Sequence, residues 1–261
     1  MRLFSLKSSL PINRDQIVIA IGLVVIVALG WAYMIHLARG MDRNMSMVMP
    51  QVIPWNWVDW WSMFLMWTVM MVAMMIPSAT PTILIYAMVN RNRKQNSLAY
   101  VSTSIFLSGY LIAWIAFSLV ATVVNWAIHT QGLLTGMMGA STSNILGASL
   151  LIVAGIFQWT PFKYACLNHC RTPMGFIMTE WKEGKLGAIK MGLKHGSYCV
   201  ACCWLLMALL FVLGVMNLLW IGALAAFVLL EKLLPQGIWV SKISGLGFIT
   251  WGAILILINY I

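Results

Sequence analysis

The stretch around which this sequence is organised is His195-Gly-Ser-Tyr-Cys199-Val-Ala-Cys202-Cys203-Trp204, which opens a long apolar run. If the run is a helix, His195, Cys199 and Cys202 fall at i, i+4 and i+7 and share one face. Cys203 follows at i+8, beside that face. Thiolate and imidazole are ligands for Cu(I), Zn(II) and iron–sulfur clusters. The stretch therefore predicts a metal site on a helix that lies in an apolar environment.

A second cluster lies upstream, in Cys166-Leu-Asn-His169-Cys170. The two stretches together hold all five cysteines and two of the four histidines. One buried cysteine is an ordinary small apolar residue, but two clusters that each include a histidine indicate a shared site. We predict that four thiols converge at the inner end of the helix that follows His195: Cys166, Cys170, Cys199 and Cys202. Cys203, His169 and His195 are expected to complete or support the site.

The composition predicts an all-α, polytopic membrane helix bundle that forms a single integral membrane domain over residues 1–261. The chain is 62% hydrophobic and 8% charged, which excludes an ordinary soluble domain. We expect about seven transmembrane helices, at residues 16–38, 57–89, 98–128, 144–160, 196–215, 218–234 and 243–260. Pro77 and Pro81 are expected to kink or break the second span. Residues 161–194 are expected to lie along the inner membrane surface as short amphipathic helices.

The distribution of basic residues predicts the orientation. Of the 16 Lys and Arg residues, all but Arg39 and Arg43 lie on one side of the predicted spans. Under the positive-inside rule that side is cytoplasmic. The N-terminus and both cysteine clusters are therefore expected inside and the C-terminus outside, in the periplasm of a bacterial inner membrane. The net charge of +10 is then a topology signal, and we expect no nucleic acid partner.

Methionines form a second pattern. The loop after the first predicted span holds Met45, Met47 and Met49 and is expected to face outward. In the second span Asp59, Met63, Met66, Met70 and Met74 step by 4, 3, 4 and 4 residues along one helix face. Thioethers are soft ligands that suit Cu(I), so the two groups predict a possible second metal path toward the cysteines. Ordinary packing by a flexible apolar side chain is the alternative.

One carboxylate in a predicted span has two interpretations. Glu231 is followed by Lys232 near the end of the sixth span. The two side chains could form an interfacial pair whose charged ends reach toward water. Alternatively, Glu231 could orient His169 or His195 from behind the metal site.

The motifs resemble a known family. They are Met70-Met-Val-Ala-Met-Met-Ile-Pro77, Gln158-Trp-Thr-Pro-Phe-Lys163, Cys166 to Pro173, His195 to Trp204, and Val215 to Asn217 with Leu230 to Lys232. Over roughly residues 55–235 the chain resembles the bacterial domain of unknown function 2182 family, whose members are described as predicted metal-binding integral membrane proteins. The resemblance implies metal binding through the cysteines and implies no reaction. Ala201 stands where the family pattern leads us to expect glycine.

The interpretation that we favour is a membrane protein that handles, delivers or houses Cu(I), with zinc or iron as other possible ions. One alternative is a transmembrane thiol-redox carrier, because Cys199 and Cys202 have a dithiol spacing and Cys166 with Cys170 could be its partner pair. Another is a subunit of a membrane copper or iron oxidoreductase, although no arrangement of acid, base or nucleophile fixes a catalytic reaction. The expected partners are the lipid bilayer, a metal ion, and other membrane subunits or a periplasmic copper protein.

Overall fold

The computed structural model describes residues 14–44, 55–95, 102–131, 134–135, 140–141 and 144–260. Apart from one strand pair, the regular structure in these ranges is helical; β1 (Leu134–Thr135) runs antiparallel to β2 (Ala140–Ser141). The helices are α1 (Arg14–Asn44), α2 (Trp57–Gln95), α3 (Thr103–Thr130), α4 (Asn144–Phe157), α5 (Pro161–Arg171), α6 (Pro173–Thr179), α7 (Gly184–Ala208), α8 (Leu210–Leu213), α9 (Leu218–Leu233) and α10 (Gly237–Tyr260). The all-α prediction is confirmed.

Five of the described helices are long and apolar enough to cross a membrane: α1, α2, α3, α10, and α7 together with α8. The pair α4 and α5, bent by 66°, would make a sixth span if it crosses as one broken helix. Helix α9 has 16 residues, fewer than the roughly 20 that span a bilayer without thinning it. The chain is thus consistent with a multi-pass membrane protein, with five or six such spans where the sequence predicted seven.

Local sequence explains where α5 and α9 begin. Thr160 caps α5, because its hydroxyl accepts a hydrogen bond from the backbone N–H of Lys163, and Pro161 occupies the first helical position. The side chain of Asn217 caps α9 in the same manner. Helix α2, by contrast, continues without a break through Pro77 and Pro81, so the expected break is absent.

Helix α7 begins earlier than predicted. The expected span started at residue 196, whereas the helix starts at Gly184, whose φ of 78° suits glycine. The basic residues of its first turns lower the local hydropathy, so a prediction from hydropathy places the start of the helix too late. As a result, His195 lies in the middle of a helix and not at its mouth.

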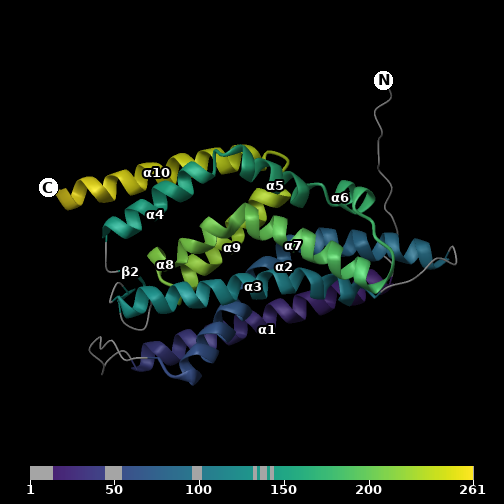
Figure 1. Cartoon of the computed structure of the whole chain (residues 1–261), viewed down its shortest axis with the longest axis horizontal. Helices are drawn as coiled ribbons and strands as arrows, with labels where there is room; N and C mark the ends of the chain where they lie inside the picture. The colour runs from purple at the N-terminus through teal and green to yellow at the C-terminus, as the bar shows by residue number, and fades with distance from the viewer. Residues whose placement is uncertain are drawn as a thin grey trace.

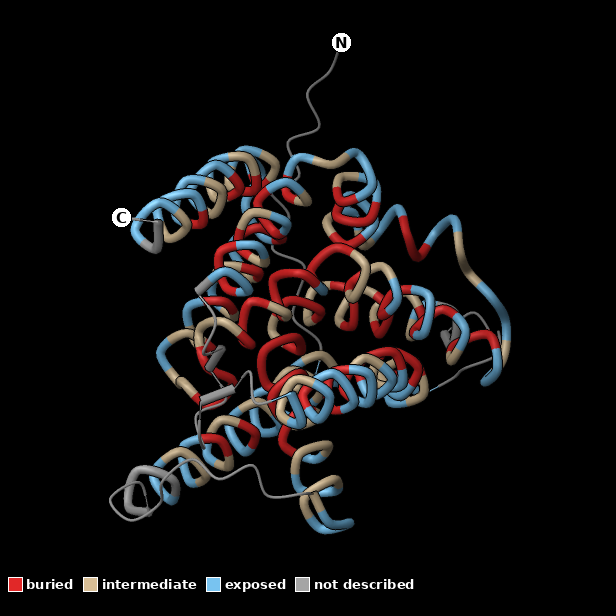
Figure 2. The backbone as a smooth tube through the Cα atoms, turned by 60° about the vertical axis from the view of Figure 1, so that its left-hand side comes forward, coloured by how far each residue is buried: buried red, intermediate tan, exposed pale blue. Residues whose placement is uncertain are grey.

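Helices α2 and α7 form the centre of the bundle. In their most apolar windows 56% and 50% of the residues are buried, against 17% for both α1 and α10. Helix α2 contacts α1, α3 and α9, and α7 contacts α3, α4, α5 and α9. Figure 1 shows α4 and α10 running side by side along one edge of the molecule, and in Figure 2 the buried backbone is concentrated in the central helices.

Glycines allow α3 and α7 to approach each other closely. A side chain at Gly109 would clash with the backbone oxygen of Ile189, and one at Gly192 would clash with that of Phe106. This contact fixes α3 against the part of α7 that precedes the cysteines.

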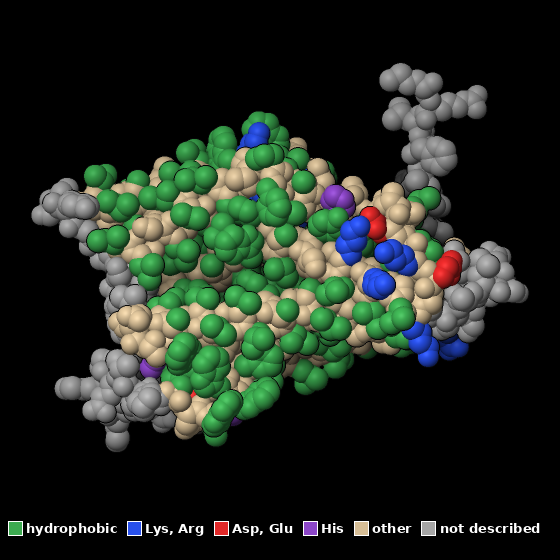
Figure 3. Space-filling view, viewed as in Figure 1, with side chains coloured by type: hydrophobic (Ala, Val, Ile, Leu, Met, Phe, Trp, Pro, Cys, Tyr) green, Lys and Arg blue, Asp and Glu red, His purple; other side chains and the backbone are tan. Residues whose placement is uncertain are grey.

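The surface divides into an apolar body and a charged end. Figure 3 shows hydrophobic side chains over most of the visible face and Lys and Arg side chains gathered near α6 and the start of α7. Such an asymmetry is expected where one end of a helix bundle meets a membrane–water boundary.

Candidate metal centre

The two cysteine clusters lie together. Helix α5, which carries one cluster, packs against α7, which carries the other. All five cysteines are buried, and none forms a disulfide. Cys166 and Cys170 share the buried face of α5, as the i, i+4 spacing predicted. Cys199, Cys202 and Cys203 lie on the buried face of α7.

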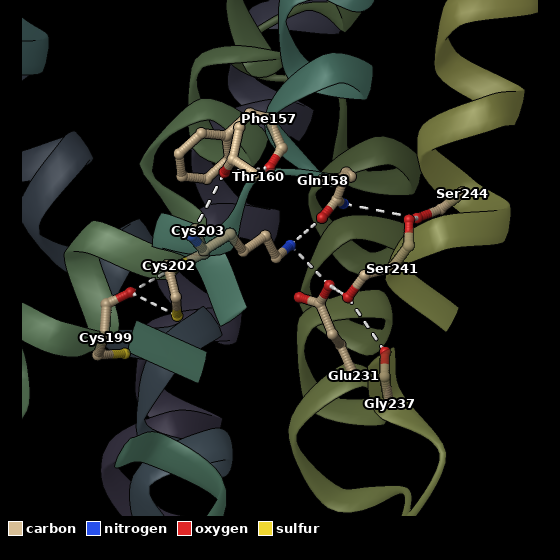
Figure 4. A network of polar contacts seen from close by, with 11 residues as sticks. Phe157, Gln158, Thr160, Cys199, Cys202, Cys203, Glu231, Gly237, Ser241 and Ser244 are labelled. Carbon is tan, nitrogen blue, oxygen red and sulfur yellow. Dashed lines mark hydrogen bonds and ion pairs between the residues drawn. The ribbon is translucent and has the colours of Figure 1, made fainter. Parts of the chain in front are cut away.

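Cys170 links the clusters directly. Its thiol lies within hydrogen-bonding reach of the thiols of both Cys199 and Cys202. Two of the α7 thiols also bond to the helix backbone: the Sγ atoms of Cys202 and Cys203 donate to the Cys199 carbonyl at 3.1 and 2.8 Å (Figure 4). Cys166 lies on the same buried face of α5 as Cys170. The thiols therefore form one continuous group and not two separate ones.

Cys199 is the most highly connected thiol. The ammonium of Lys232, on α9, donates to Cys199 Sγ at 2.9 Å and to the hydroxyl of Ser78, on α2, at 3.1 Å. The Tyr110 hydroxyl, on α3, lies 3.2 Å from the same sulfur and 3.2 Å from the Met75 carbonyl oxygen, to which it donates. Side chains of α9 and α3 thus meet at one sulfur atom of α7, and both also bond to α2, so the group around the sulfur is charged as well as polar.

The two predicted histidines have different surroundings. His195 is buried among aromatic rings, with the Phe176, Tyr110 and Phe106 centroids at 5.2, 5.8 and 6.3 Å. Its Nδ1 atom is buried and has no hydrogen-bond partner among the described residues. An unsatisfied buried nitrogen one turn before Cys199 is a free donor site that a soft metal could use.

His169 lies at the rim of the cluster. Its side chain is exposed, its ring stacks on Tyr198 with centroids 4.3 Å apart, and its Nδ1 atom lies 2.8 Å from the Ala165 carbonyl oxygen. Nearby, Lys194 forms an ion pair with Glu180 at 2.7 Å. The hydrogen bond from Lys194 lowers the pKa of the Glu180 carboxyl below its ordinary value. This rim is therefore the exposed and charged edge of the site.

Glu231 does not contact either histidine. Its carboxylate forms an ion pair with Lys163 Nζ at 2.6 Å, and both side chains are 0% exposed. Ser241 also donates to Glu231, and Lys163 donates to the side chain of Gln158 (Figure 4). The predicted histidine-orienting role therefore has no contact to support it. The expected interfacial pair is likewise absent, because Glu231 and Lys232 are both buried.

The ion pair nevertheless positions the site. Lys163 lies in the first turn of α5, Gln158 follows the end of α4, Glu231 is on α9 and Ser241 is on α10. The network fixes the bend between α4 and α5 against α9 and α10. Because Cys166 and Cys170 follow Lys163 on the same short helix, the network also sets where these two thiols meet α7.

The methionine stripe on α2 is buried along most of its length. Met66, Met70 and Met74 lie in the core, and Met63, nearer the start of the helix, receives a hydrogen bond at 3.4 Å from the Asn125 amide. Met74 precedes Ser78 by about one helical turn. The C-terminal end of the stripe therefore lies one turn from Ser78, which accepts a hydrogen bond from Lys232.

The outer part of the predicted path is only partly visible. Asp59 lies in the first turn of α2 and accepts a hydrogen bond at 2.9 Å from the backbone N–H of Asn56. Its contacts are those of a helix cap. Met45, Met47 and Met49 lie outside the described residues.

The donor set favours a soft ion of low coordination number. Within the described ranges, no three His, Cys, Asp or Glu side chains are spaced so that they could hold one metal ion. Two thiolates suffice for Cu(I), which is stable in linear sulfur coordination, whereas structural zinc sites use four ligands. The chemistry of the thiols therefore fits Cu(I) better than Zn(II).

Comparison with known proteins identifies the family. Residues 64–255 match the family model PpoB2, described as a copper chaperone. The chain belongs to the PpoB2 copper chaperone family. No curated protein and no solved structure matches it. The name domain of unknown function 2182, to which the motifs pointed, is not confirmed. A copper-related function is shown by the family; zinc and iron gain no support.

The PpoB2 match covers the structural core of the site. Residues 64–255 include all five cysteines, His169, His195, Lys163, Glu231 and Lys232. They also include Met66, Met70 and Met74. Asp59, Met63 and the outer methionines precede the match, so a role for these in copper handling rests on this sequence alone.

Sequence reasoning missed four residues of the site: Ser78, Tyr110, Lys163 and Lys232 as a partner of the thiols. A signal existed for one of them. Lys163 carries a charge opposite to that of Glu231, and opposite charges within otherwise apolar segments are costly unless they are paired. For Ser78 and Tyr110 no spacing rule applies, because their helices come to the site only in the folded bundle.

Proposed function

We propose that this chain is a membrane-embedded Cu(I) chaperone that holds the ion at the thiol group of α5 and α7. The ion would bind two of three neighbouring thiols, those of Cys199 and Cys202 on α7 and Cys170 on α5, and Cys166, Cys203 and His195 lie around them. His169 is positioned at the rim, where the ion would be passed on. The observation that carries the proposal is the convergence of the two clusters on one buried group, within a region that matches a copper chaperone family.

The proposed route to this site follows the methionine stripe. From Met63 to Ser78 the α2 axis rises about 22 Å at 1.5 Å per residue. Thioethers can bind Cu(I) without losing a proton, whereas thiols must lose one. A passage from methionine to cysteine is therefore a passage from weaker to tighter binding. We propose that Met45, Met47 and Met49 collect the ion and that Met63, Met66, Met70 and Met74 lead it inward.

The proposed setting is the bacterial inner membrane, with the thiol group on the cytoplasmic side. The excess of Lys and Arg in the loops on one side supports this orientation. The proposed partners are the lipid bilayer and a copper protein that receives or supplies the ion, either another membrane subunit or a periplasmic protein.

The test is anaerobic Cu(I) titration of the purified protein, followed by measurement of bound copper per chain. The Cys199→Ser/Cys202→Ser variant should lose the tightly bound ion, since a hydroxyl is a poor ligand for Cu(I). Ser118→Ala is the matched control, because Ser118 is a buried residue on α3 whose hydroxyl donates to the Trp114 carbonyl of its own helix. Retention of tight copper binding by the double variant would rule out the thiol group as the site.

A thiol-redox carrier is the second candidate, and the observation that favours it is the closeness of Cys170 to Cys199 and Cys202. Two such thiols could be oxidised to a disulfide, with release of two electrons and two protons to an acceptor. Alkylation with iodoacetamide, with and without a Cu(I) chelator, separates the two functions. A chelator-dependent increase in alkylation indicates copper, whereas a reductant-dependent increase indicates a redox pair.

A further inference from the structure

Lys232 is a buried cation that forms no ion pair with a carboxylate of the described residues. Its ammonium donates to Cys199 Sγ at 2.9 Å and to Ser78 Oγ at 3.1 Å. The neighbouring acid, Glu231, is already paired with Lys163, and within the described part of the chain Lys232 belongs to no ion pair. An ammonium in an apolar interior is costly unless a negative charge offsets it. The cation therefore requires an anion that a carboxylate does not supply.

Copper binding would supply that anion. When Cu(I) binds two thiols, two S–H bonds break, two Cu–S bonds form, two protons pass to water, and copper keeps its oxidation state. The product is a bis-thiolate copper complex with one negative charge. We propose that Lys232 is the built-in counter-ion of this complex, so that ion and site together are neutral in the membrane interior. This inference rests on the proposed copper site.

The same charge explains how the site could choose between metals. A divalent ion on two thiolates is neutral, so with the Lys232 ammonium the site would keep one positive charge. A third thiolate would restore neutrality, but no three donors among the described residues are spaced for one ion. The ammonium thus favours a monovalent soft ion, Cu(I) or Ag(I), over Zn(II). Ser78 contributes by holding the ammonium toward Cys199 from the α2 side.

The experiment compares the affinities of the full-length protein in detergent for two metals. Cu(I) is titrated in competition with bathocuproine disulfonate, and Zn(II) with a chromogenic chelator. Lys232→Met removes the charge and keeps the length of the side chain, whereas Lys232→Arg keeps the charge. We expect Lys232→Met to lose roughly 10- to 100-fold in Cu(I) affinity and the ratio of Cu(I) to Zn(II) affinity to fall. Lys232→Arg should stay much closer to the wild-type ratio.

The ratio makes the outcomes distinct. If Lys232→Met lowers the affinities for Cu(I) and Zn(II) by the same factor, Lys232 is merely structural and the inference is overturned. Cu(I) affinity equal to that of the wild type would also overturn it, while leaving the proposed function intact. If the wild-type protein binds no Cu(I), the inference and the proposed function fail together.

Discussion

The buried ion pair between Lys163 and Glu231 allows a quantitative prediction. At 2.6 Å, two unit charges attract by about 6 kcal/mol at an effective dielectric constant of 20. Desolvation of both groups offsets much of this, so the pair as a whole contributes little net stability. Removal of one partner is different, because it leaves a buried charge alone. Lys163→Met or Glu231→Gln should each lower the free energy of unfolding by roughly 3–5 kcal/mol.

The assay is equilibrium unfolding by sodium dodecyl sulfate from mild detergent micelles, followed by circular dichroism. The double variant, Lys163→Met with Glu231→Gln, should lose less unfolding free energy than the sum of the losses in the two single variants, because neither charge is left unpaired. The control is Lys194→Met, which breaks the half-exposed pair with Glu180 and should cost at most about 1 kcal/mol. Additive effects of the two single substitutions would refute the role assigned to the pair.

Three further predictions concern the stripe, the packing and the topology. Met70→Leu with Met74→Leu should reduce copper content or flux in cells, while each substitution lowers the free energy of unfolding by less than about 1.5 kcal/mol. Unchanged copper content and flux would assign the stripe to packing alone. Gly192→Ala should force α3 and α7 apart and lower the thermal midpoint, whereas Gly22→Ala, which meets no neighbouring atom within 4 Å, should not; equal midpoints would contradict the close helix contact. A cysteine introduced at Ser46 should react with a membrane-impermeant maleimide in intact cells, and its protection there would reverse the orientation.

The helical class and much of the site could be predicted from sequence because both depend on local periodicity. The apolar runs predicted helices, and the i, i+4 and i+7 spacing placed His195, Cys199 and Cys202 on one buried face, as the structure has them. The same argument placed Cys166 and Cys170 on one face of α5. Spacing of this kind survives folding, since it depends only on the geometry of one helix.

Contacts between helices could not be predicted in the same way. The sequence placed Lys232 at a membrane boundary because lysine next to an acid commonly reaches toward water. The structure instead directs Lys232 to Cys199 and Glu231 to Lys163, because consecutive residues on a helix point about 100° apart. Which helix lies opposite each of them is a property of the bundle. The start of α7 was missed for a local reason, since its first turns are rich in lysine and glycine.

The central claim is that buried cysteine sulfur binds copper. X-ray absorption at the copper K-edge, on protein loaded with one equivalent of Cu(I), tests it most directly. If the thiol group binds the ion, the spectrum should show the edge of a two-coordinate Cu(I) ion with sulfur as its nearest neighbours. This signal should be lost in the Cys199→Ser/Cys202→Ser variant. A first shell of nitrogen and oxygen, or an unchanged sulfur shell in that variant, would contradict it.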